Sequence, residues 1–134
     1  LHPNAHTIAE ASECVASIGG NDAFWKFTNA LNDSRKVEYN PDGSLKSVEP
    51  TNVTRLSEFA ETAGVSKTAY TQCMDSGKFV EAVTEDVAEA LKTGGRGTPY
   101  SFIIAGDQQE PINGAQPYKV VKGAIDTILS QIGS

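Results

Sequence analysis

The sequence has little cysteine and no long hydrophobic run. Its 134 residues hold two cysteines, Cys14 and Cys73, and neither belongs to a CxxC motif or to a Cys/His cluster with zinc-site spacing. No apolar stretch approaches the roughly 20 residues that cross a bilayer, and no basic-then-apolar leader opens the chain. We therefore expect no metal centre, no membrane span and no redox motif in these residues.

Basic residues are few as well. Lys and Arg number 11 against 17 Asp and Glu, which gives a net charge of −6, and no stretch gathers the basic residues. A phosphate backbone is bound by clustered Lys and Arg, so nucleic acid is not an expected partner. The length and the 39% hydrophobic content favour one compact body with a real core.

Helical periodicity dominates the first two-thirds of the chain. Apolar residues at i, i+3 and i+4 predict helices over about 3–18, 21–31, 56–63, 66–77 and 78–93, with a stop at Gly19-Gly20. Phe24, Trp25 and Phe27 are expected to supply bulky core side chains. Residues 32–50 are polar, and their Asn-Pro-Asp-Gly turn at 40–43 predicts a surface loop.

The character changes after Gly95. Residues 100–105 form an aromatic and β-branched run that predicts a buried strand, and a second short strand around Pro111 completes a hairpin. A final amphipathic helix begins at Pro117. One hairpin and one helix do not close a core, so further strands are implied on a second chain, on a copy, or upstream of Leu1. A first residue other than Met predicts a processed or truncated product.

Five stretches occur in an order that resembles the DsbA-like thioredoxin family. They are Leu1–Ala5 leading into the helix with Glu13-Cys14, Phe24-Trp25, Tyr70–Gly77, Gly97–Ile104 and Gly114–Tyr118. The resemblance implies an α/β, thioredoxin-like fold with a helical insertion. Residues 1–95 would supply the mostly helical insertion domain, and residues 96–134 the cis-proline β-hairpin and C-terminal helix of the thioredoxin-like domain.

The resemblance also implies an activity. The parent protein would be a bacterial, periplasmic or otherwise extracytoplasmic thiol:disulfide oxidoreductase without a cofactor, acting on unfolded or extended polypeptides with thiols or disulfides. This chain lacks the CxxC segment, so it would hold no catalytic residue and be redox-inactive alone. Its loop at Gly97, Thr98 and Pro99 would bind the substrate. A redox partner protein is a further expected partner, and the missing N-terminal segment or a swapped copy would pair with the exposed sheet edge.

The two cysteines admit two interpretations. Cys14 and Cys73 lie on the apolar stripes of separate predicted helices, where they form either a structural disulfide or two buried thiols. A disulfide would close a loop of about sixty residues and stabilise the fold by roughly 4 kcal/mol. The oxidising compartment that the resemblance implies favours the disulfide.

Alternatives remain open at other positions. His2, His6 and Glu10 are spaced i, i+4, i+8, as a helical metal site would be, although a solvated helix face explains them as well and Pro3 disfavours the alignment. Phe24 and Trp25 could form a peptide-binding surface instead of core. For the whole chain, the alternatives are a non-catalytic thioredoxin-like peptide-binding module and a glutathione-dependent isomerase or transferase of related fold.

Overall fold

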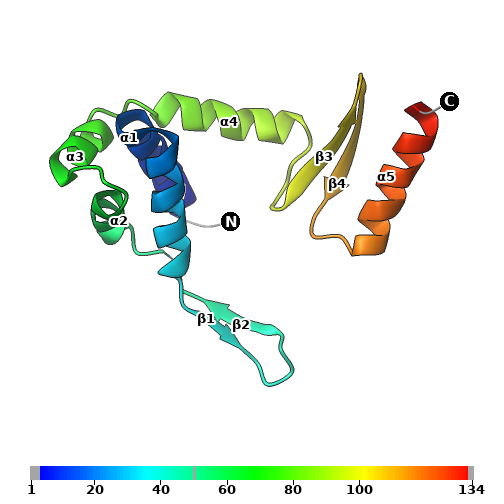
Figure 1. The fold of residues 1–134 in the computed structure, drawn as a ribbon, viewed down its shortest axis with the longest axis horizontal. Coiled ribbons are helices and arrows are strands. Elements are labelled where there is room, and N and C mark those ends of the chain that lie inside the picture. Colours follow the sequence, from blue (N-terminus) through cyan, green and yellow to red (C-terminus); the bar gives the residue numbers. More distant parts are fainter. Residues whose placement is uncertain (1–3, 50, 133–134) are drawn as a thin grey trace. The chain divides into compact units, whose positions relative to one another are not determined.

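A computed structural model describes residues 4–49 and 51–132, so His2 and Pro3 lie outside the described residues. The elements, shown in Figure 1, are α1 (Ala5–Asp33), β1 (Val37–Tyr39), β2 (Leu45–Val48), a 3₁₀ turn (Val53–Arg55), α2 (Leu56–Thr62), α3 (Lys67–Asp75), α4 (Val80–Lys92), β3 (Tyr100–Ala105), β4 (Gln108–Asn113) and α5 (Tyr118–Ile132). They form two compact units, Leu1–Asp86 and Val87–Ser134. This division falls inside α4, and a domain boundary at residue 95 stays a prediction.

The long helix α1 is kinked where the sequence predicts a break. Gly20 has φ 75° and ψ −171°, values outside the helical region that glycine adopts without steric cost. A Cβ at Gly19 would lie 2.5 Å from the Ala23 Cβ and 3.0 Å from Val65 Cγ2. The two glycines therefore allow the chain to bend and to pack closely against the segment that follows α2.

The core of the first unit lies between α1, α2 and α3. Ser66 caps α3 by accepting a hydrogen bond from the Ala69 N–H at 3.3 Å, as the sequence predicts for a helix start. The core consists of buried apolar side chains from these helices and their connections: Ala11, Val15, Ala23, Phe27, Leu31, Leu56, Phe59, Ala60, Ala63, Val65 and Tyr70.

Trp25 is not part of this core. Its exposed fraction is 57%, whereas Phe27 is fully buried and Phe24 is half-buried. Trp25 makes an edge-to-face contact with Phe24, with ring centroids 5.2 Å apart. The prediction that all three aromatics are core was wrong for Trp25, because residues two apart on a helix point to different sides.

Residues 37–48 are a β-hairpin and not the predicted loop. β1 and β2 pair antiparallel, with Val37 opposite Val48 and Glu38 opposite Ser47. The turn residues at 40–43 were interpreted correctly, because Gly43 has φ 81° and its N–H bonds to the Asn40 carbonyl at 2.9 Å. The strands were missed because they have only three and four residues, too few to show a period of two.

In the second unit, β3 and β4 form a two-stranded antiparallel sheet. Pro111 pairs with Phe102, at a position whose backbone nitrogen points away from β3, so its missing N–H removes no ladder bond. Of the other described elements, α5 makes the main contact with β3.

This second unit buries little of its apolar surface. Among its described residues, Ile128 on α5 is the apolar residue that is buried. Phe102 is 37% exposed and Ile104 is 67% exposed, so the prediction of a buried strand was wrong for this chain. The strand has core composition, but the described residues provide no second layer to cover its open face.

We predict that Phe27→Ala lowers the free energy of unfolding by about 3–5 kcal/mol, because it removes a fully buried aromatic side chain and leaves a cavity. Trp25→Ala is the matched control, since this neighbouring aromatic is 57% exposed; its expected cost is below about 1 kcal/mol. Urea denaturation followed by circular dichroism measures both. Equal losses would contradict the assignment of Phe27 to the core.

Candidate functional site

The segment between α4 and β3 presents the predicted substrate loop. Thr98 and Pro99 are exposed, Gly97 is half-buried, and the peptide bond between Thr98 and Pro99 is cis. The loop is anchored on one side by Tyr100, whose hydroxyl donates to the Thr93 carbonyl at 2.8 Å. This hydrogen bond ties the start of β3 to the segment that follows α4.

Within this loop, the backbone of Pro99 is hydrogen-bonded and that of Thr98 has no partner in the described part of the chain. The Pro99 carbonyl accepts from the Gly114 N–H at 3.0 Å, which extends the β3–β4 ladder by one pair. Thr98 takes part in no hydrogen bond within the described residues. Exposed backbone groups of this kind are available to an incoming extended chain, because a strand pairs through them.

The same alternation continues along β3. In an antiparallel pair, every second residue turns its N–H and C=O toward its partner strand. Since Pro99 bonds to Gly114, the backbone groups of Tyr100, Phe102 and Ile104 face the opposite edge. No strand in the described residues pairs with that edge. β3 thus offers an open row of donors and acceptors that starts beside Thr98.

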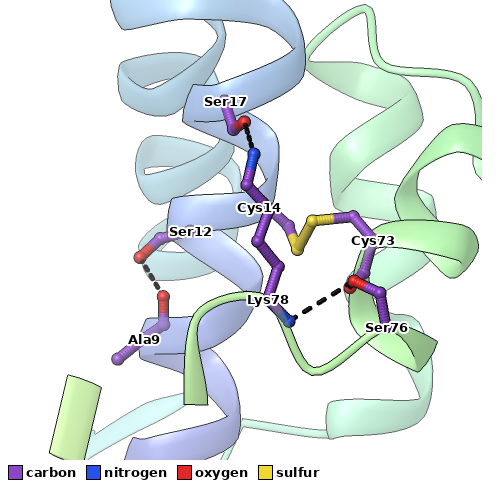
Figure 2. The surroundings of a disulfide bond; sticks show 7 residues. All are labelled: Ala9, Ser12, Cys14, Ser17, Cys73, Ser76 and Lys78. Carbon is purple, nitrogen blue, oxygen red and sulfur yellow. Dashed lines mark hydrogen bonds between the residues drawn. A yellow bond between two sulfur atoms is a disulfide. The ribbon is translucent and has the colours of Figure 1, made fainter. Parts of the chain in front are cut away.

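Cys14 and Cys73 form a disulfide between α1 and α3, with Cα atoms 5.8 Å apart (Figure 2). Cys14 is buried and Cys73 is half-buried. The bond accounts for both cysteines of the sequence, so the chain has no free thiol to act as a nucleophile. The two cysteines are therefore joined across two helices, and the absence of redox cysteines from this chain stays a prediction.

Lys78 connects the two helices next to this disulfide. Its Nζ donates to Ser17 Oγ at 2.8 Å, and its backbone N–H donates to Ser76 Oγ at 3.3 Å. Ser17 lies one turn after Cys14, and Ser76 one turn after Cys73, so Lys78 spans the same pair of helices (Figure 2). Sequence reasoning missed this residue because a single lysine after a helix carries no local signal of a distant partner.

Of the three residues of the alternative metal site, the structure describes His6 and Glu10. His6 Nδ1 lies 2.6 Å from Glu10 Oε1, and His6 Nε2 lies 3.3 Å from Thr84 Oγ1 on α4. His2 lies outside the described residues. Within the part of the chain that is described, no three His, Cys, Asp or Glu side chains gather as a metal would require. His6 links α1 to α4 through hydrogen bonds.

Two clefts lie apart from the substrate loop. One of about 510 Å³ lies between β4 and α5, lined by Gln108, Gln109, Glu110, Ala124, Thr127, Ile128 and Gln131. Another of about 380 Å³ lies in the helical unit, where burial raises the pKa of Tyr70. Neither includes Thr98 or a disulfide cysteine, so neither adds to the loop's chemistry.

We predict that replacing both cysteines, as Cys14→Ala/Cys73→Ala, lowers the free energy of unfolding by roughly 4 kcal/mol, because the bond spans 59 residues of sequence and restricts the unfolded chain. Urea denaturation without reductant measures the change. The wild-type chain in excess dithiothreitol is the control and should lose a similar amount. A loss below about 1 kcal/mol would contradict a structural role for the bond.

Comparison with known proteins agrees with this architecture. The family model described as DSBA-like thioredoxin domain matches residues 45–126, more than half of the chain. No curated protein and no solved structure gave a match. None of the helices in the described part of the chain is long and apolar enough to cross a membrane. The matched span contains α2 to β4 with the Thr98-Pro99 loop. The chain therefore belongs to the DSBA-like thioredoxin family, a family of the disulfide oxidoreductase type.

Proposed function

We propose that this chain is the substrate-holding part of an extracytoplasmic thiol:disulfide oxidoreductase, and that the redox cysteines come from a CxxC segment outside these 134 residues. The observation that carries the proposal is the free backbone of Thr98. It is exposed, it has no hydrogen-bond partner among the described residues, and it precedes a strand whose outer edge is open.

An extended substrate would pair with Thr98 as an additional strand. The backbone N–H and C=O of this residue supply one donor and one acceptor, which any polypeptide sequence can use. Binding through the backbone suits an enzyme that acts on many unfolded proteins.

The open edge of β3 supports the existence of a further segment. Tyr100, Phe102 and Ile104 turn their backbone groups to an unpaired edge, and the last two side chains are exposed by 37% and 67%. A two-stranded sheet with an apolar face is marginally stable in water. A strand from the CxxC-bearing segment would pair with this edge, which leaves Thr98 at the end of the completed sheet.

The chemistry would proceed by thiol-disulfide exchange. A thiolate of the CxxC segment attacks one sulfur of a substrate disulfide, a mixed disulfide forms, and the other substrate sulfur leaves as a thiolate. The second CxxC cysteine then displaces the substrate, so the substrate is reduced and the enzyme oxidised; substrate oxidation is the reverse sequence. Residues of this chain would position the substrate strand, and the exchange would take place at the CxxC segment, because Cys14 and Cys73 are 59 residues apart and join two helices instead of forming a CxxC motif.

One observation favours a second candidate, a peptide-binding module without redox activity. Both cysteines of the chain are in a disulfide that joins two helices of the first unit, whereas Thr98 belongs to the second unit. Binding at Thr98 needs no thiol. The two candidates share the substrate and differ only in whether a CxxC segment joins the chain.

We predict that the purified chain neither reduces insulin nor oxidises dithiothreitol-reduced ribonuclease above the uncatalysed rate, because it has no CxxC motif and its one disulfide joins two helices. The protein extended by its natural upstream residues should catalyse one or both reactions. A turbidity assay and a thiol titration measure the rates. Activity of the chain alone contradicts the proposal, and an inactive extended protein that still binds peptide at Thr98 favours the second candidate.

Amide hydrogen exchange tests the open edge separately. In the chain alone, the amides of Tyr100, Phe102 and Ile104 should exchange at least tenfold faster than those of Ser101 and Ile103, whose N–H groups bond to β4. In the extended protein, the first group should become protected. Uniform exchange along β3, or an unchanged pattern after extension, would argue against a strand that pairs with this edge.

A further inference from the structure

The β1–β2 hairpin has one exposed apolar face. All seven strand residues are exposed, and the cross-strand pairs place Val37, Tyr39, Leu45 and Val48 on the same side. Their exposed fractions are 42%, 65%, 59% and 44%. In Figure 1 the hairpin extends away from the helices of its own unit. Its apolar residues therefore lie outside the core described above.

The charges of the hairpin lie on its other face. Lys46 Nζ lies 3.0 Å from Glu38 Oε2, and Ser47 Oγ donates to the same oxygen at 3.2 Å. The polar side chains satisfy one another, so they draw no charged partner to the apolar side. A ligand for the apolar face must itself be uncharged where it makes contact.

Both ends of the hairpin are held in place. At the turn, Asp42 Oδ1 accepts from the Ser44 N–H at 2.9 Å and from Ser44 Oγ at 2.6 Å, and these bonds hold the pKa of Asp42 below its usual value. At the base, Arg35 Nε donates to Thr51 Oγ1 at 3.3 Å, and Thr51 is buried. The apolar face is therefore formed before any ligand arrives.

The size of the face decides what can cover it. In a stable protein interface, each partner buries about 800 Å² of surface. Even if all four side chains were as large as an aromatic one, their exposed fractions would leave an accessible area of roughly half that value. The face is thus too small for a stable interface with a second copy or another folded protein. A single extended segment needs less area, because it also gains backbone hydrogen bonds at a strand edge.

Such an edge is present on β1. The Lys36 carbonyl accepts from the Glu49 N–H, and the Asn40 N–H donates to the Ser44 carbonyl, so these residues face β2. By alternation, the backbone groups of Val37 and Tyr39 face outward. No other strand pairs with β1 in the described residues.

We propose that the β1–β2 hairpin is a second binding site, for an extended, uncharged apolar segment of an unfolded polypeptide. The segment pairs with the outer edge of β1, and its apolar side chains pack beside Val37 and Tyr39, which extends the apolar face that these residues form with Leu45 and Val48. This inference rests on the proposed function for the class of substrate. It adds a site in the first unit, which holds a substrate by its apolar sequence.

The test uses the full chain and fluorescently labelled, reduced and carboxymethylated α-lactalbumin, an unfolded probe without thiols. Tyr39→Ser/Leu45→Ser removes the two most exposed apolar side chains of the face. Glu38→Ser/Lys46→Ser is the matched control, because it changes two residues of the same hairpin on the polar side. Fluorescence anisotropy should show at least tenfold weaker binding for the first variant and less than twofold for the control.

Hydrogen exchange of the wild-type chain gives a readout that needs no variant. Saturating probe should slow exchange of the Val37 and Tyr39 amides, and unchanged rates overturn the proposal. Equal affinity of both variants and wild type overturns it too. Sedimentation that shows wild-type dimers, abolished by Tyr39→Ser/Leu45→Ser, would assign the face to a second copy and also overturn it.

These outcomes are separable from those of the proposed function. Protection at Val37 and Tyr39 without catalysis by the extended protein would leave the hairpin site standing and remove the oxidoreductase. Catalysis by the extended protein with unchanged exchange at the hairpin would do the reverse.

Discussion

The unpaired outer edge of β3 is the constraint on which the second unit depends. Its backbone groups alternate between β4 on one side and no partner on the other, and its apolar side chains are partly exposed. A strand of this composition belongs inside a sheet, where both edges are paired and both faces covered. Thr98 precedes this strand, so it would lie at the end of a completed sheet, with its backbone groups still free.

The first unit does not share this dependence. Its helices surround a closed core, and the Cys14–Cys73 bond ties α1 to α3 at the edge of it. Both cysteines of the chain are used for this connection between helices. The helical unit thus has its own covered core, whereas β3 of the second unit pairs only with β4 among the described residues.

Much of this could be predicted from the sequence, and the failures have physical causes. Helix starts and stops followed from Ser66 and Gly20, which act through their own backbone or cap geometry and so need no distant information. Trp25 was placed in the core because spacing alone does not say which helix face is covered. The hairpin at 37–48 was missed because strands of three and four residues are too short to show a period of two.

The candidate site divides in the same way. The loop at Thr98-Pro99 was located from a motif and a resemblance, and the family match includes it. The free state of the Thr98 backbone depends on which residues β4 pairs with, since the Pro99 carbonyl is taken by Gly114. Register of this kind, like the contact of Lys78 with Ser17, is a tertiary property that no local pattern contains.

The central claim is that the backbone of Thr98 binds an extended substrate. The most direct measurement is a titration of the ¹⁵N-labelled chain with a thiol-free, extended peptide, followed by the amide resonances on both sides of Pro99. The account predicts a saturable shift of the Thr98 amide signal while that of Gly114, already bonded to the Pro99 carbonyl, changes little. A Thr98 signal that does not move at peptide concentrations that saturate binding elsewhere on the chain would contradict it.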